Sequence, residues 1–453
     1  MNIIKKIIVT AFALVFVQLT LTAEQKTEDG YSFRLKASRD GSEYKKGETA
    51  EFVLSATKGG NPVDGLKISG SITKDSVPMN RNFSGELKGG KFKVSGTLNE
   101  AGFLKCKMFV KIPQPDGKDK LVDLLAGAAF DPLEIKPSLP APDDFDAYWD
   151  RQKKILSEIP MNIKLTPIKS GAAGVKMFDV QADSFNGKMS AYMAYPENAK
   201  AKSLPAIVTT HGAGVRSSSY GGVMAWAKRG FIALDFNAHG LPNGKPDKFY
   251  SDLAKGELKG YPLKNCEDRD TVFFRTLYMR LMRAMEVVMA QPQWDGKNLM
   301  VCGGSQGGGQ AIVAGGLNPK VTVVAAMFPA ICDHSGAAIS RTTGWPHFTR
   351  LDLNGNYNKK ATEAARYIDA VNFAPRIKGN VVYMINYADN VCEPTSCYAA
   401  YNNIKTPKRL FINEESRHTP AKGTYQTVQS WGVDIIKKSS PNVGMERNRQ
   451  STY

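Results

Sequence analysis

The chain has 453 residues, more than one ordinary domain needs, and a formal net charge of +17 at pH 7. Its six cysteines are too few for a disulfide scaffold, and no stretch beyond the N-terminal segment is long and apolar enough to span a bilayer. The positive charge indicates either binding to an acidic polysaccharide or simply a lysine-rich solvated surface. Nucleic acid is not expected, because no helix-turn-helix, RNP or zinc-finger spacing occurs.

The first 23 residues have the pattern of a secretory signal peptide. Lys5 and Lys6 form a basic start, residues 7–17 are apolar, and Leu21-Thr22-Ala23 offers a small-residue cleavage site. We therefore expect a cleaved leader, no membrane span, and a mature protein that is secreted or periplasmic.

Residues 24–130 predict an all-β, immunoglobulin-like sandwich domain. Short runs of alternating apolar residues recur between turns rich in Gly and Asn, without helical periods. These runs are 31–35, 50–54, 66–70 and 91–95. No titratable cluster or aromatic platform stands out, so we expect a spacer or packing module. The Pro-rich segment 131–142 predicts a linker to the next domain.

From residue 143 to residue 453 the pattern predicts one α/β domain. Acidic residues at 143, 144 and 146 open an amphipathic helix, and apolar side chains at helical spacing predict a long helix over 271–291. Buried-strand patterns alternate with the helices, which is typical of a mostly parallel central sheet. The expected strands are 206–210, 231–235, 299–302, 321–327, 381–385 and 409–412.

The segment Gly303-Gly304-Ser305-Gln306-Gly307 follows one of these strands and precedes a run of helix-compatible residues. A strand that enters a helix through Gly-x-Ser-x-Gly is the nucleophile elbow of the α/β-hydrolase fold. The turn exposes the serine hydroxyl, and only glycines fit beside it. Ser305 is therefore the candidate nucleophile of a catalytic domain, and a structural Gly-Ser turn is the alternative.

A serine nucleophile needs a base and a carboxylate, which in this fold follow it in the order Asp or Glu, then His. Of the five histidines, only His418 follows the last expected strand, so it is the candidate base by elimination. Asp389 comes directly after the strand 381–387, where it could orient the imidazole. Asp333, beyond the preceding strand, is the chief competitor for that role.

The oxyanion of the reaction needs two backbone N–H donors. We expect one from Gln306, the residue after the nucleophile, and one from Ala213 in the loop that follows the strand 206–210. No His-Glu-x-x-His, Cys-x-x-Cys or phosphate-binding loop occurs, so we expect neither a metal nor another cofactor. Cys392 and Cys397 are close enough in sequence to bridge; buried free thiols are the alternative.

The elbow 303–308, the segment Asp389-Asn390-Val391-Cys392-Glu393-Pro394 and the helix start at 142–149 resemble the acetyl xylan esterase and cephalosporin-C deacetylase family, carbohydrate esterase family 7. The resemblance covers about residues 140–435. It implies a serine esterase that removes acetyl groups from sugars, with Ser305 as nucleophile, Asp389 as acid and His418 as base. It also makes an oligomer possible, because members of that family often form rings.

Three positions depart from the family pattern. Asn237-Ala238-His239-Gly240 stands where the family usually has Arg-Gly-Gln, and Thr419 follows the histidine in place of Glu. Ala213 replaces a Tyr, which keeps the backbone donor but removes an aromatic wall from the acyl pocket. The departures leave the glycan and the acyl group open.

We expect a serine esterase that hydrolyses acetyl or other short acyl esters on plant-type polysaccharides or their oligosaccharides through an acyl-enzyme. One alternative is a peptidase of the prolyl-oligopeptidase type, but about 110 residues before the hydrolase cannot form the propeller of those proteins. The other is an inactive hydrolase fold that binds glycans, which the complete set of Ser305, Asp389 and His418 disfavours.

Overall fold

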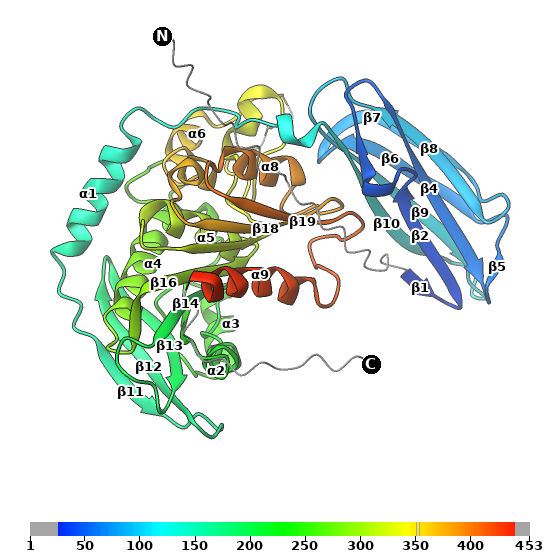
Figure 1. Ribbon diagram of the computed structural model, residues 1–453. Helices are drawn as coiled ribbons and strands as arrows, with labels where there is room; N and C mark the ends of the chain where they lie inside the picture. The colour runs from blue at the N-terminus through cyan, green and yellow to red at the C-terminus, as the bar shows by residue number, and fades with distance from the viewer. Residues whose placement is uncertain (1–25, 350, 353, 440–453) are drawn as a thin grey trace, which may run out of the picture.

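The computed structural model describes residues 26–349, 351–352 and 354–439 (Figure 1). The expected signal peptide, residues 1–23, lies outside these residues. Within the described part of the chain, no helix is long and apolar enough to cross a membrane.

Residues 26–130 form two five-stranded sheets, called here the N-terminal sheets. The first has the order β1-β2-β4-β5, with β8 paired to β4, and the second has the order β3-β10-β9-β6-β7. All pairs are antiparallel except β3 with β10. The strands are β1 (Lys26–Glu28), β2 (Tyr31–Ala37), β3 (Glu43–Tyr44), β4 (Thr49–Lys58), β5 (Asn61–Pro62), β6 (Lys67–Lys74), β7 (Val77–Glu86), β8 (Lys91–Thr97), β9 (Gly102–Pro113) and β10 (Asp119–Phe130).

The two N-terminal sheets enclose one apolar core. Alternation along β4 buries Phe52 and Leu54, and alternation along β6 buries Ile68 and Ile72, all in the same cluster. The four strand patterns expected from the sequence lie largely within β2, β4, β6 and β8. The strands β7, β9 and β10 were not among those expected from the sequence. Two sheets over a shared core agree with a sandwich; an immunoglobulin-like topology stays a prediction.

The rest of the described chain is built on a mixed sheet of nine strands, in the order β11-β12-β13-β15-β14-β16-β17-β18-β19. The six strands from β15 to β19 in this order are parallel, and β11, β12 and β13 extend them antiparallel. The strands are β11 (Lys164–Ile168), β12 (Val175–Ser184), β13 (Gly187–Pro196), β14 (Leu204–Thr210), β15 (Ile232–Phe236), β16 (Trp294–Gly304), β17 (Val323–Met327), β18 (Asn380–Asn386) and β19 (Lys408–Asn413).

Helices cover both faces of this sheet. On one face, β13 residue Met193 joins the core cluster of α1, α4, α5, α7 and α8; on the other, its neighbour Tyr192 joins that of α2 and α9. The expected long helix is α4, and all six expected strands are present. The helices are α1 (Phe145–Ser157), α2 (Tyr220–Ala227), α3 (Asp247–Lys255), α4 (Phe273–Met289), α5 (Gln306–Leu317), α6 (Lys359–Ala365), α7 (Ala370–Phe373), α8 (Pro394–Asn403) and α9 (Thr424–Ser439).

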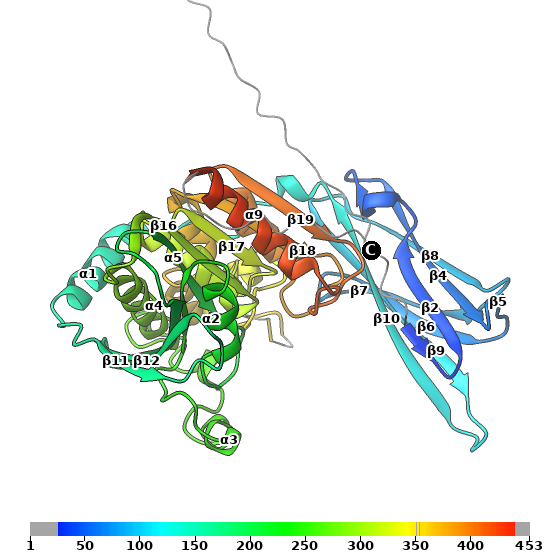
Figure 2. The ribbon, with the colours of Figure 1, turned by 60° about the horizontal axis from the view of Figure 1, so that its bottom comes forward.

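The Pro-rich segment 131–142 runs along the second part of the chain and is hydrogen-bonded to it. Asn402 of α8 donates to the carbonyl oxygens of Pro132 and Ile135, at 2.9 and 2.8 Å. Ser138 donates its N–H and its hydroxyl to Asp333, at 2.7 and 2.8 Å. The N-terminal sheets consequently stand beside β18 and β19 (Figures 1 and 2).

Candidate active site

Ser305 stands in the sharp turn between β16 and α5. Its φ of 57° and ψ of −125° fall where residues with a side chain are rare. The turn is held from both sides, since Ser305 N–H donates to Met327 at 3.0 Å and its carbonyl accepts from Ala330 at 2.9 Å. Gly303 is required here, because a Cβ would collide with Thr210. The elbow predicted from the sequence thus exists as a strained turn.

His418 faces the serine from the loop between β19 and α9. Its Nε2 lies 3.0 Å from Oγ of Ser305, and the ring of Phe328 packs edge-on against the imidazole, with centroids 5.2 Å apart. The side chain of His418 is 28% exposed, so the imidazole borders both the protein and solvent. The hydroxyl and the imidazole are within proton-transfer distance.

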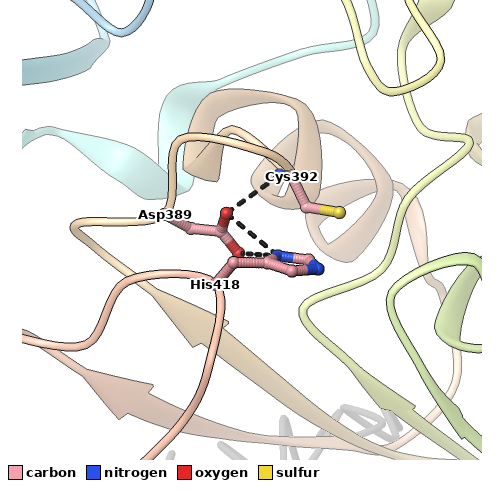
Figure 3. A group of neighbouring side chains, drawn as sticks. All are labelled: Asp389, Cys392 and His418. Carbon is pink, nitrogen blue, oxygen red and sulfur yellow. Dashed lines mark hydrogen bonds and ion pairs between the residues drawn. The ribbon is translucent and has the colours of Figure 1, made fainter. Parts of the chain in front are cut away.

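Asp389 lies behind the imidazole and is fully buried (Figure 3). Its two carboxylate oxygens lie 2.9 and 3.1 Å from Nδ1 of His418, and Oδ1 also accepts the N–H groups of Val391 and Cys392, at 2.8 and 2.9 Å. A carboxylate with these partners accepts the proton on Nδ1. Nε2 is therefore left without a proton and can accept the proton of the serine hydroxyl.

The histidines His211, His239 and His334 are unsuited to act as bases at Ser305. Burial lowers the pKa of His211 to about 4, and that of His239 and His334 to about 3. His211 lies near the elbow, but its Nδ1 donates to the carbonyl of Gly212 at 2.7 Å. His239 is packed edge-on against the ring of Tyr261. Both side chains are therefore neutral at pH 7 and have a structural role.

The loop 211–214 approaches Ser305 from the end of β14. A Cβ on Gly212 would lie 3.6 Å from Cβ of Ser305, so the backbone of this loop touches the nucleophile turn. Arg216 donates to the carbonyl of Ala213. The N–H of Gln306 belongs to the first turn of α5, where helices leave N–H groups without an intrahelical acceptor. Two backbone segments that can offer N–H donors thus converge on Ser305.

Cys392 adds a thiol to the site that the sequence analysis did not place there. Its sulfur lies 3.9 Å from Oγ of Ser305 (Figure 3 shows it over the far end of the imidazole). Asp389, Cys392 and His418 could together offer three ligand atoms to a metal, since these lie within 4.8 Å of one another. Burial raises the pKa of the Cys392 thiol well above its usual range, which opposes the thiolate that a metal requires. Asp389 and His418 therefore fit the hydrogen-bonded relay to Ser305 better than a metal site.

Asp333, the competing carboxylate, belongs to a different cluster. It accepts hydrogen bonds from Ser138 and forms an ion pair with Arg341. Through Ser138 it holds the Pro-rich segment in place. Cys392 and Cys397 are both free thiols and both buried. The bridge between them, which the sequence left open, is therefore not formed.

Tyr261 is a further residue of the site that sequence reasoning missed. Its hydroxyl accepts the N–H of Gly214 at 3.0 Å and donates to Oε1 of Gln306 at 2.8 Å. It comes from a short turn more than forty positions from either partner. No local pattern around it marks it as part of a site.

Comparison with known proteins agrees with this geometry. Residues 131–434 match the acetyl xylan esterase (AXE1) family. The acetyl esterase Axe7A of Xylanibacter ruminicola is 31% identical over 407 residues, which are 87% of this chain and 88% of that protein. Residues 131–453 alone are less than 87% of the chain, so the similarity to Axe7A continues into the N-terminal sheets.

Two solved structures share the fold of about two thirds of the chain. The acetyl xylan esterase from Paenibacillus sp. R4 has a TM-score of 0.59 and 24% identity, and covers 67% of this chain and 98% of its own. Acetyl xylan esterase 1 from Thermoanaerobacterium sp. JW/SL YS485 has a TM-score of 0.55 and 22% identity, and covers 67% and 97%. With the family match over most of its length, the chain belongs to the acetyl xylan esterase family and is a carboxylic ester hydrolase of the α/β-hydrolase fold.

Proposed function

We propose that this protein removes acetyl groups from xylan or its oligosaccharides, with Ser305 as nucleophile, His418 as general base and Asp389 as the carboxylate that orients the imidazole. The observation that carries the proposal is the unbroken hydrogen-bonded chain from Oγ of Ser305 through His418 to Asp389, at 3.0 and 2.9 Å. The family match and the acetyl esterase relative support acetyl groups on xylan as the substrate.

In the acylation step, Oγ of Ser305 attacks the acetyl carbonyl carbon while its proton passes to Nε2 of His418. The negative charge forms on the former carbonyl oxygen, and the N–H groups of Gln306 and Ala213 stabilise it. The C–O bond to the sugar then breaks, and His418 returns the proton to the departing sugar oxygen. Acetyl-Ser305 and a free sugar hydroxyl remain.

In the deacylation step, water takes the place of the sugar. Nε2 of His418 accepts a proton from the water, whose oxygen attacks the acetyl carbon, and the bond to Oγ breaks as the serine recovers its proton. Acetate leaves. The buried Asp389 carboxylate stabilises the imidazolium in both steps without itself taking the proton.

We also propose the organisation around this centre. Residues 1–23 direct export and are removed, residues 24–130 are an immunoglobulin-like sandwich domain, residues 131–142 link it, and residues 143–453 are the α/β-hydrolase catalytic domain. The basic, apolar and small-residue order of the leader supports export, and the shared core of β1–β10 supports a separate domain.

Hydrolysis of p-nitrophenyl acetate by the wild type and by Ser305→Ala tests the proposed chemistry. We expect the substitution to reduce kcat by about 10⁴-fold or more. Ser157→Ala, at the exposed end of α1, is the control and should retain wild-type turnover. Equal activity in Ser305→Ala and wild type would refute the nucleophile. Acetate release from acetylated xylan, pectin and mannan oligosaccharides then identifies the glycan, and a preference for pectin or mannan would refute xylan.

A further inference from the structure

The N-terminal sheets contact the two loops that carry Asp389 and His418 and are not merely tethered to the rest of the chain. The backbone of β10 lies directly on Tyr387, because a Cβ on Gly127 would collide with the Tyr387 carbonyl. The Tyr387 hydroxyl donates to Glu43 at 2.8 Å, and its ring packs edge-on against Phe103 of β9, with centroids 4.9 Å apart. Figure 2 shows β10 running beside the ends of β18 and β19.

A buried contact joins β9 to the Asp389 loop. The ammonium group of Lys105 forms an ion pair with Glu393 and also donates to the carbonyl oxygen of Asp389. The side chains of Lys105 and Glu393 are only 4% and 1% exposed. Ser76, also from the N-terminal sheets, donates to the second oxygen of Glu393. A buried ammonium is costly unless it is paired, and both partners of this one belong to the loop that carries Asp389.

A partly exposed contact joins β10 to the His418 loop. Arg417, the residue before His418, donates to the side chain of Asp123 at 2.9 Å and to its carbonyl oxygen at 3.0 Å. From the same loop, Glu415 forms a two-point ion pair with Arg34 of β2, at 2.7 and 3.1 Å. Bidentate arginine contacts fix orientation as well as distance. The His418 loop is thus held from outside its own domain.

Lys105 and Asp123, which make the buried and the partly exposed contact, belong to one β-hairpin. β9 and β10 pair antiparallel along twelve residues each, with Lys105 opposite Gly127 and Asp123 opposite Phe109. A hairpin paired over this length inside a five-stranded sheet is rigid, so the spacing between Lys105 and Asp123 is fixed. The two loops that it holds are therefore kept at a fixed separation from each other.

We propose that the β9–β10 hairpin is part of the catalytic apparatus, in which Lys105 and Asp123 are positioning residues that keep Asp389 and His418 in register. The inference rests on the proposed function of that pair. Neither residue touches substrate; each acts through the loop that it holds. An N-terminal region that only spaced or displayed the enzyme would not need to bury an ion pair beneath the Asp389 loop.

Asp123→Ala is the first test, because this side chain is 38% exposed and its loss should not prevent folding. We expect kcat to fall about 10-fold, less than the roughly 10²-fold cost of a 1 Å misplacement, with KM within about twofold. Glu51→Ala is the matched control. Glu51 is also 38% exposed and also ion-paired, but with Lys93 inside the N-terminal sheets. It should leave kcat unchanged, and Asp123→Glu should restore part of the loss.

Two readouts separate positioning from general damage. The groups that face the His418 ring are Asp389, Cys392, Ser305 and Phe328. If the imidazolium loses contact with its carboxylate, it releases its proton more readily, so the acidic limb of the kcat/KM profile moves to lower pH in Asp123→Ala. In proton NMR, the downfield signal of the proton shared by His418 and Asp389 should also move or broaden. General destabilisation would change neither.

The buried contact is tested by the double variant Lys105→Met with Glu393→Gln, which removes both charges of the ion pair at once. The buried carboxyl of Asp75, which also interacts with Lys105, has a pKa raised by burial. We expect the same loss of kcat and the same spectral change in the folded fraction. Wild-type kcat in both folded variants, with an unchanged downfield signal, would overturn the proposal. The NMR signal does not depend on ester turnover, whereas failure of the proposed function appears as full activity in Ser305→Ala.

Discussion

The hydroxyl of Tyr261 lies 2.8 Å from Oε1 of Gln306, the residue that directly follows Ser305. The Tyr261 hydroxyl oxygen also accepts the N–H of Gly214, so this one side chain ties the loop after β14 to the start of α5. These are the two segments whose N–H groups we propose as donors to the oxyanion. Their separation therefore depends on a residue that contributes no donor itself.

Removal of this hydroxyl in Tyr261→Phe should lower kcat for p-nitrophenyl acetate by about 10-fold, less than the 10²- to 10³-fold cost of removing an oxyanion donor outright. KM should change little, because the effect is on the transition state. Tyr250→Phe is a suitable control, since that hydroxyl, on α3, is hydrogen-bonded to Pro242 and Lys245 in the preceding loop. A wild-type rate in Tyr261→Phe would show that the two segments hold their spacing without it.

Asp389→Asn should reduce kcat by about 10⁴-fold, because an amide cannot accept the proton on Nδ1 and stabilise the imidazolium. Asp333→Asn is the informative comparison, since Asp333 was the competing candidate and is also buried. It contacts Ser138 and Arg341, so its loss should lower thermal stability while the folded enzyme keeps its kcat. A steep loss of kcat in Asp333→Asn, with a mild loss of kcat in Asp389→Asn, would make Asp333 the carboxylate that orients His418.

The residues around Ser305 could be anticipated because chain order and local pattern define them. Adjacent residues alone predict the strand, the Gly-rich turn and the helix around Ser305. Only one histidine follows the last strand. The strands β11–β13 were not among the expected strands, and their antiparallel direction could not be anticipated either, since strand direction depends on partners that a local pattern does not name.

The contacts of Lys105 could not be anticipated in the same way. It lies in a strand whose other lysines, Lys107 and Lys111, are exposed, and its partners Asp389 and Glu393 are 284 and 288 positions away. A lysine in a β-strand is usually solvated, so only the assembled structure reveals the buried pair. The N-terminal sheets therefore looked like a spacer in the sequence.

Gly303→Ala should destabilise the protein by about 1–3 kcal/mol or more and abolish turnover, because the new Cβ would meet Thr210 and the backbone of Gly307. Gly221→Ala is a control of opposite sign. Gly221 lies in α2 with nothing within 4 Å of an added Cβ, so alanine should stabilise by up to about 1 kcal/mol. Thermal unfolding of both variants measures the contrast. Similar melting temperatures would mean that the turn relaxes around the extra methyl group.

The buried Glu393 should make stability depend on pH. Burial raises its pKa from 4.5 to about 7, against the opposing effect of Lys105. The folded chain therefore keeps a proton that the unfolded chain releases between these values. This contribution to stability is complete below pH 4.5 and is lost as pH rises through about 7.

Glu393→Gln has no proton to lose, so the free energy of unfolding of the variant minus that of the wild type should grow with pH across this window, by up to about 3 kcal/mol. Urea unfolding at several pH values measures it. Glu86→Gln is the control, because the hydrogen bond from Lys67 lowers the pKa of that exposed carboxyl and places its titration below the window. A difference that stays constant with pH would mean that Lys105 keeps Glu393 ionised throughout, and the ion pair would then hold the Asp389 loop equally well in acid and at neutrality.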